Sequence, residues 1–248
     1  MAYPTPQFRL DPTVDALDSG GAQADNNEAV ASWKSGDYAF AATGATYKST
    51  GMDGYPCVSL ASSGSLENTD IPAYTGDFTV LMVSKADPAA GVEAYGFGGR
   101  STSTSVWALF TEKWNNTGHM GLTAYGGNPA ESDTGIHIAN EIDICVVRFS
   151  GTTATVRRNN TVWSATVTRT SPNLNGLVIN GFRRSNTVNS SFARLVGDVI
   201  GWNSALTDAE LDEVITEMIS KYELKVLASS GPIIRRVLRG SVIGGLLR

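Results

Sequence analysis

The sequence has few of the residues that cross-link or catalyse, because its 248 residues include only two cysteines and two histidines. A chain of this length buries enough surface to fold without a disulfide or a metal. We therefore expect Cys57 and Cys145 to be reduced core residues, although their positions also permit a bond between them. His119 and His137 have no cysteine or acidic partner at ligand spacing, and no serine lies in a Gly-x-Ser-x-Gly elbow. We predict no cofactor and no metal centre.

Long apolar runs and a basic excess are also missing. No stretch of about twenty apolar residues occurs, so no membrane span is predicted. Residues 1–6 lack the basic start and apolar centre of a secretory signal, and we expect folding in a cytoplasm. The net charge of −5 is dispersed through the body of the chain, which argues against nucleic acid as a partner.

Most of the chain consists of short apolar or alternating runs separated by Gly, Ser, Thr and Asn. This pattern, with 26 glycines and no alternation of strands with helices, predicts an all-β protein built as a two-sheet antiparallel sandwich. We expect strands over residues 78–84, 94–98, 106–110, 119–125, 140–151, 152–157, 161–168, 176–180 and 195–200.

One short helix is predicted near the end of the sandwich. Thr207 is the candidate N-cap and Glu210 completes a capping box. Its apolar stripe is expected to face the sandwich and consists of Leu211, Val214, Ile215, Met218 and Tyr222. The acids near residues 208–213 suit the positive end of a helix and are interpreted as a solvated helix start.

Two stretches carry a family resemblance. The first is the strand pair over residues 140–151 and 155–163, and the second is the strand and helix over residues 197–214. Together with Leu10-Asp-Pro, Val30-Ala-Ser-Trp33, Ala45–Lys48 and Gly51–Val58, they resemble the laminin-G-like, concanavalin A-like lectin–glucanase jelly roll of the kind found in bacteriophage virion structural proteins. The resemblance covers about residues 8–227. It implies a jelly roll that binds rather than catalyses, within a virion.

The sequence divides into three parts. Residues 1–9 are predicted as an extended N-terminal arm, because prolines disfavour pairing there, residues 10–227 as the lectin-like domain, and residues 228–248 as an anchoring tail. The tail has four arginines and no acid. Its predicted assembly residues are Ile233, Ile234, Arg235, Arg236, Val237, Leu238, Arg239, Val242, Ile243, Leu246 and Leu247.

So many apolar side chains on one tail are expected to be buried against another subunit or another protein. A basic amphipathic helix on a membrane surface is the rival interpretation, which Gly240, Gly244 and Gly245 weaken.

Hydrolase chemistry has one candidate motif, the run Glu141-Ile-Asp143-Ile-Cys145. It resembles the Glu-x-Asp-x-Glu strand of laminarinase-type glycoside hydrolases, whose acids share one face of a strand. Here the third carboxylate is replaced by Cys145, so the proton donor for the leaving oxygen is missing. We predict a protein that is not an enzyme.

The polar loops contain the candidate ligand sites. Asp133, within residues 126–135, is the preferred calcium candidate, but the same stretch is better explained as a turn. A sugar site needs an exposed aromatic ring beside amides, and the candidates are Trp114, Asn115, Asn116, Tyr125 and Asn128. The competing interpretation is that the tryptophans pack the core and Trp114 covers a loop.

The leading functional hypothesis is a noncatalytic bacteriophage virion structural protein, a head decoration or tail-associated subunit. Its sandwich would face outward while the C-terminal tail docks onto other virion proteins. We expect the subunit to be repeated as a homo-oligomer within the particle. The alternative is a carbohydrate-binding adhesin for host glycans. A degenerate glycoside hydrolase centred on Glu141 and Asp143 is the third hypothesis.

Overall fold

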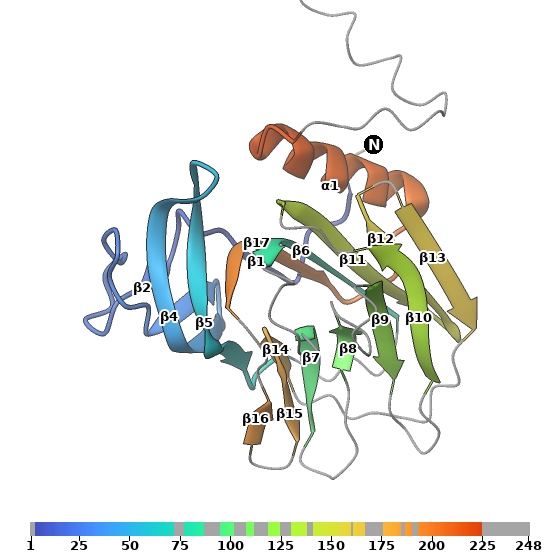
Figure 1. Ribbon diagram of the computed structural model, residues 1–248, viewed down its shortest axis with the longest axis horizontal. Coiled ribbons are helices and arrows are strands. Elements are labelled where there is room, and N and C mark those ends of the chain that lie inside the picture. The colour runs from blue at the N-terminus through green and yellow to red at the C-terminus, as the bar shows by residue number, and fades with distance from the viewer. Residues whose placement is uncertain are drawn as a thin grey trace, which may run out of the picture.

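A computed structural model describes residues 3–71, 77–86, 95–101, 108–111, 119–124, 130–137, 141–159, 161–166, 176–184, 187–189 and 193–224. Within them, two mostly antiparallel sheets pack face to face, and helix α1 (Asp208–Lys221) lies across the outer face of one sheet (Figure 1). The predicted all-β sandwich with one short helix is confirmed.

The first sheet is built around β17 (Arg194–Trp202). One edge of β17 pairs with β6 (Phe78–Ala86), and the sheet continues through β11, β12 and β13. Two strands share the other edge, with β5 opposite residues 194–196 and β1 opposite residues 199–201. The bounds of these further strands are β1 (Phe8–Leu10), β5 (Tyr55–Asn68), β11 (Asp143–Ser150), β12 (Thr153–Arg158) and β13 (Thr161–Thr166).

The second sheet begins where β5 bends away from β17. Residues 66–68 of β5 pair with β14, and the sheet continues through β7, β8, β9 and β10 on one side and through β4, β3 and β2 on the other. The long β4–β5 hairpin therefore joins the two sheets. The bounds are β2 (Ala16–Leu17), β3 (Ser32–Ser35), β4 (Tyr38–Met52), β7 (Tyr95–Ser101), β8 (Ala108–Thr111), β9 (His119–Ala124), β10 (Ala130–His137) and β14 (Leu177–Ile179), with β15 (Phe182–Arg184) parallel to β7 and β16 (Thr187–Asn189) beside β15.

Strand alternation creates two buried layers. On β6, Val80 and Met82 face the core between the sheets, whereas Leu81 and Val83 face α1. Strands β11 and β17 alternate in the same way, so the centre of the first sheet is buried on both faces. Cys57 and Cys145 are free and buried, and they lie in different layers.

Helix α1 begins as predicted. The Thr207 hydroxyl accepts a hydrogen bond from the amide of Glu210, and the Glu210 carboxylate accepts one from the amide of Thr207. All five residues of the predicted apolar stripe are buried. Among the residues described, no helix is both long and apolar enough to cross a membrane.

The start of the chain lies against its own domain. The Trp202 indole donates to the carbonyl of Pro4 at 2.9 Å, the amide of Gln7 donates to the carbonyl of Gly201, and Phe8 belongs to β1. The described part of the predicted arm therefore completes the first sheet. Asp133 lies within strand β10, opposite Gly121, and not in the turn that its polar surroundings predict.

Candidate functional site

The predicted sugar-binding residues lie outside the described part of the chain. Trp114, Asn115 and Asn116 belong to the segment that joins β8 to β9, whereas Tyr125 and Asn128 belong to the segment that joins β9 to β10. Because β9 runs between these connections, they start from opposite strand ends, roughly 20 Å apart for a strand of this length. Nothing in the described strands brings the two groups together, and the site stays a prediction. All the predicted tail residues also lie outside the described residues.

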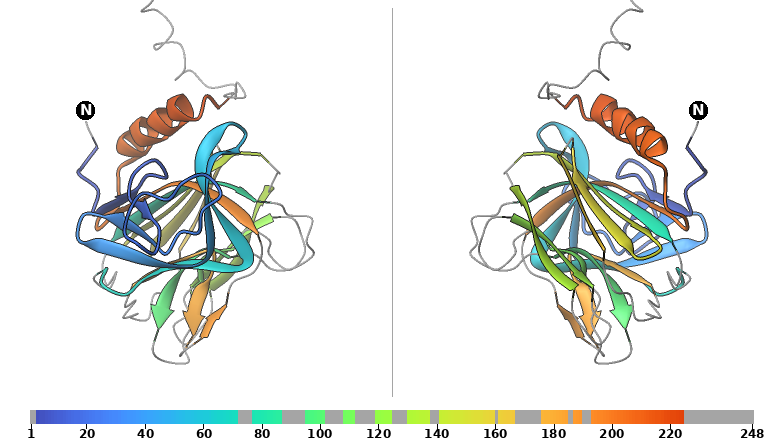
Figure 2. Two further views of the ribbon diagram at one scale, coloured as in Figure 1. Left: turned by 90° about the vertical axis from the view of Figure 1, so that its left-hand side faces the viewer. Right: turned by 90° about the vertical axis from the view of Figure 1, so that its right-hand side faces the viewer.

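The two sheets differ in what covers their outer faces. Helix α1 covers the outer face of the first sheet through Leu211, Val214 and Met218 (Figure 2). On the second sheet, Ala41, Glu67, Val178 and Gly98 are successive register partners on the face opposite the core. Val178 is fully buried even on that face, whereas Ala41 is exposed. The described surface available to a ligand on the second sheet therefore lies on its β4 side.

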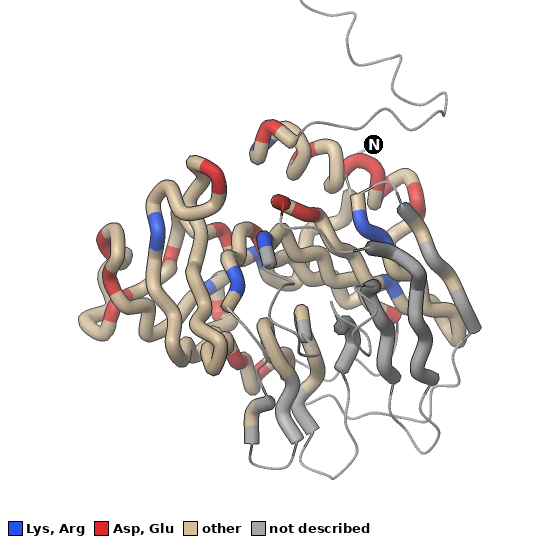
Figure 3. Tube along the Cα trace, viewed as in Figure 1, with Lys and Arg blue, Asp and Glu red and all other residues tan. Residues whose placement is uncertain are grey.

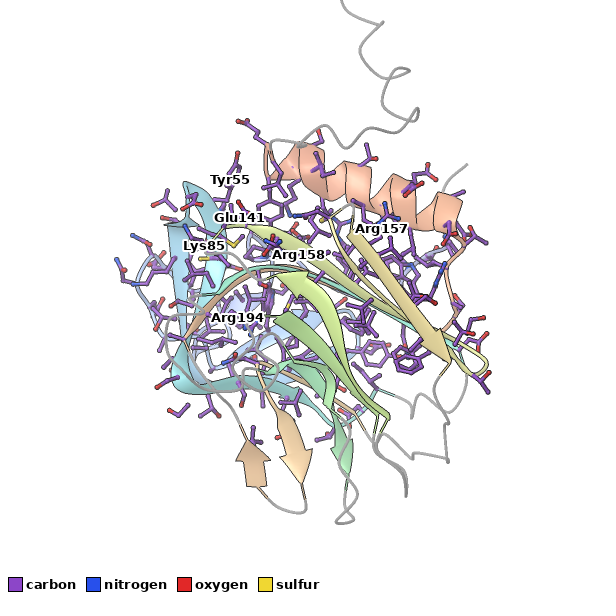
Figure 4. The ribbon with its side chains drawn as sticks, turned by 45° about the vertical axis from the view of Figure 1, so that its right-hand side comes forward. Tyr55, Lys85, Glu141, Arg157, Arg158 and Arg194 are labelled. Atoms are coloured by element: carbon purple, nitrogen blue, oxygen red, sulfur yellow. The ribbon has the colours of Figure 1, made fainter. Side chains whose placement is uncertain are left out.

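The acids of the hydrolase motif pair with Arg158 of β12. Cys145 points into the core between the sheets, and Asp143, two residues earlier on β11, shares that face. Arg158 forms ion pairs with Asp143 at 2.7 Å and with Glu141 at 3.1 Å, and Asn159 donates a hydrogen bond to Asp143 (Figure 4). The carboxylates are thus engaged by a neighbouring strand.

Replacing Glu141 by glutamine is expected to leave any polysaccharide turnover by the full chain unchanged. The reason is that Glu141 pairs with Arg158 and no third carboxylate stands at Cys145. Reducing-sugar release should be compared between the wild type and the variant. Turnover that is present in the wild type and lost in the variant would establish the hydrolase hypothesis.

Within the described residues, an extensive polar cluster lies where β1, β17 and the end of α1 meet. Asp198 is fully buried at the irregularity in β17 between Val196 and Val199. Its carboxylate accepts a hydrogen bond from the Tyr222 hydroxyl at 2.7 Å and pairs with Lys221 at 2.8 Å and with Arg9 at 3.4 Å. We call this cluster, with Asp11 and Glu217, the Asp198 clamp.

The outer carboxylates of the clamp are held in their charged form. Burial alone would raise the pKa of Asp11, but hydrogen bonds from Lys221 and Thr13 outweigh it and lower that pKa. Burial would likewise raise the pKa of Glu217, but hydrogen bonds from Tyr3 and Arg9 outweigh it and lower that pKa. Their contribution to stability is therefore present above the ordinary carboxyl range and is lost as pH falls through the lowered values.

Tyr222 is the neutral member of the clamp. Burial, followed by the charge of Asp198, raises the pKa of its hydroxyl, so it remains a hydrogen-bond donor. Its ring lies against Tyr55 at a centroid distance of 5.4 Å. Gly197 leaves the space for the Tyr222 hydroxyl, because a Cβ there would lie 2.4 Å from that oxygen. The clamp is a packed structural junction.

A second buried polar group lies inside the sandwich. Arg194, which is 2% exposed, donates from Nε to the side-chain oxygen of Asn180 at 3.0 Å, and Asn180 donates to the carbonyl of Gly64. These bonds join β17 to the bend of β5 and to the end of β14. Within the described residues, no group of His, Cys, Asp and Glu side chains could hold a metal ion.

Sequence reasoning missed both buried polar clusters. Asp198 and Arg9 are separated by 189 residues, and neither belongs to a local motif. The available signal was indirect, since a charged residue within the otherwise apolar β17 requires a buried partner.

No family model and no curated protein matches the chain. Solved structures do resemble it. Trypanosoma rangeli sialidase in complex with sialic acid aligns with a TM-score of 0.64 and 16% identity, over 88% of this chain and 34% of the sialidase. The chain thus spans about a third of that protein.

Two further structures are similar over most of this chain. Domain 4 of an extracellular arabinanase from Geobacillus stearothermophilus, solved with arabinotriose, aligns over 86% of this chain and 99% of the domain, with a TM-score of 0.60 and 13% identity. The binding domain of a paraclostridial mosquitocidal protein aligns over 86% of this chain and 52% of that chain, with a TM-score of 0.56 and 13% identity. The fold is therefore a β-sandwich of the type present in carbohydrate-binding and glycosidase-type proteins.

Proposed function

We propose that this protein is a noncatalytic carbohydrate-binding β-sandwich. The observation that carries the proposal is the nearly complete alignment of its fold with an isolated arabinanase domain that was solved with an oligosaccharide bound. The placement of Glu141 and Asp143 supports binding over hydrolysis, because Arg158 engages both carboxylates and Cys145 faces the core.

The second sheet supplies the ligand surface in this proposal. The outer face of the first sheet is occupied by α1, whereas the β4 side of the second sheet has exposed positions such as Ala41 and Thr43. Trp114 follows β8, which lies beyond β14 and β7 from β4 in the same sheet, and in this proposal it is a separate contact that supplies an aromatic ring on which a sugar face would stack.

Replacing Trp114 by alanine tests the sugar-binding role. We expect the full chain to retain a subset of glycans on an array and the variant to lose about tenfold or more in affinity, the effect of removing one stacking ring. Val162→Ala is the matched control, because it removes an exposed apolar side chain from β13 of the other sheet. Unchanged binding by the Trp114 variant would remove this residue from the site, and no retention of any glycan by the wild type would overturn the proposal.

A role as a virion structural subunit is the second candidate. It rests on the tail composition and on the resemblance of residues 8–227 to bacteriophage jelly rolls. The two candidates are compatible, because a subunit held in a particle by its tail could present the sandwich to host glycans. Deleting residues 231–248 tests the virion role: incorporation into particles should be lost while the sandwich stays folded, and continued incorporation would exclude anchoring by the tail.

A further inference from the structure

Strand β13 forms one margin of the first sheet (Figure 1). It pairs with β12 on one side, and no strand within the described residues pairs with its other side, which we call the open edge. Two residues connect β12 to β13, so the pair that flanks this connection, Arg158 and Thr161, shares both backbone hydrogen bonds. Every second residue from Thr161 therefore directs its backbone groups to β12. The residues between them, Val162, Ser164 and Thr166, direct theirs to the open edge.

The composition of β13 does not protect the open edge. Natural sheets usually end in strands that are very short or charged, because a row of unpaired N–H and C=O groups is a template for another chain. The second sheet follows this rule, since β2 has two residues and β10 includes Glu131 and Asp133. In contrast, β13 has six residues, Thr-Val-Trp-Ser-Ala-Thr, without charge, proline or glycine. The open edge is therefore suited to pairing with another strand.

Helix α1 does not cover β13. Acids are spread along α1 (Figure 3), and one of them, Asp212, pairs with Arg157 of β12 at 2.7 Å. The register partner of Arg157 on β13 is Val162, which is 56% exposed, and Ser164 is also exposed. An apolar side chain thus lies in water beside the open edge, where a further strand would remove part of its surface from solvent.

We propose that a second copy of this chain pairs with the open edge through its own β13. Two edges without charges meet without like-charge repulsion, so β13 is self-complementary. Antiparallel pairing about a two-fold axis perpendicular to the sheet joins the two first sheets into one and closes the assembly as a dimer. With Trp163 on the axis, Val162 lies opposite the partner's Ser164 on the same outer face, and their backbone groups form the hydrogen bonds.

Replacing Ser164 by proline tests this pairing in the full chain. Proline removes an N–H that points to the open edge, so it is compatible with the pairing of β13 to β12 and incompatible with a partner strand. Ser164→Ala is the matched control, because it keeps the N–H and removes only the hydroxyl. Mass in solution is measured by light scattering over a series of concentrations, and circular dichroism checks that each variant is folded.

The wild type and Ser164→Ala should change from monomer to dimer as the concentration rises. Ser164→Pro should raise the dissociation constant about tenfold or more, because the two-fold axis repeats the lost hydrogen bond in both copies. If proline prevents folding, Val162→Lys takes its place, since a charge at the edge also opposes pairing. A wild type that stays monomeric at every concentration, or a dimer that a folded edge variant does not weaken, would overturn the proposed interface.

Discussion

Replacing Asp198 by asparagine should lower the free energy of unfolding by roughly 3 kcal/mol, the low end of the range for breaking a buried ion pair. Asp198 is fully buried and holds Lys221, Arg9 and the Tyr222 hydroxyl. Asparagine keeps the shape but loses the charge. The low end applies because both cations are partly exposed and keep a second carboxylate, Asp11 for Lys221 and Glu217 for Arg9.

Denaturant unfolding at neutral pH measures this effect, and Asp53→Asn is its control. Asp53 also pairs with a lysine, Lys85 at 2.6 Å, but its side chain is 53% exposed. An exposed pair contributes about 0–1 kcal/mol, so the control should unfold close to the wild type. Equal stability of the two variants would show that the clamp does not hold the end of α1 to β17.

Replacing Gly201 by alanine should destabilise the protein by about 1–3 kcal/mol through overpacking. The ring of Phe8 lies directly over Gly201, its register partner, and a Cβ at this position would lie 2.1 Å from Cε1 of the ring. Phe8 is itself 1% exposed and packs against Phe40 at a centroid distance of 5.4 Å, so the ring has no free space to enter. Strand β1 must shift or detach.

A double-mutant cycle identifies the cause. Phe8→Ala alone should cost about 3–5 kcal/mol by leaving a cavity, and in that background Gly201→Ala should cost much less than in the wild type. Additive losses in the cycle would show that the Phe8 ring is not what makes glycine necessary. Proteolysis of residues 3–10 should also accelerate in the Gly201 variant, because β1 is loosened.

Local patterns were sufficient for the helix and for the buried strands. The Thr207–Glu210 capping box and the apolar stripe of α1 are local signals, and both are present as predicted. Strands β6, β11 and β17 are near-continuous apolar runs because both of their faces are buried.

Strand pairing between residues far apart in the sequence determines the features that local patterns did not predict. Prolines predicted an extended arm over residues 1–9, and within its described part β1 occupies the part of the β17 edge that β5 leaves unpaired, a pairing that no local pattern indicated. The polar residues around Asp133 suggested a turn, yet they form β10 at the edge of the second sheet, where strand pairing does not require apolar side chains.

The candidate site was harder to predict than the fold for the same reason. Trp114 and Tyr125 lie outside the described residues, in segments on either side of β9, so their site stays a prediction. The clamp around Asp198 joins residues from both ends of the domain, and no spacing rule connects Arg9 with Lys221.

We propose that the second sheet binds a carbohydrate while α1 covers the first. Amide hydrogen exchange of the full chain, with and without an oligosaccharide retained on the array, tests this arrangement. We predict new protection in β4 and in the strands of the second sheet, with α1 and β12 unchanged. Protection centred on α1, or no protection in the second sheet at saturating ligand, would contradict a ligand surface on the second sheet.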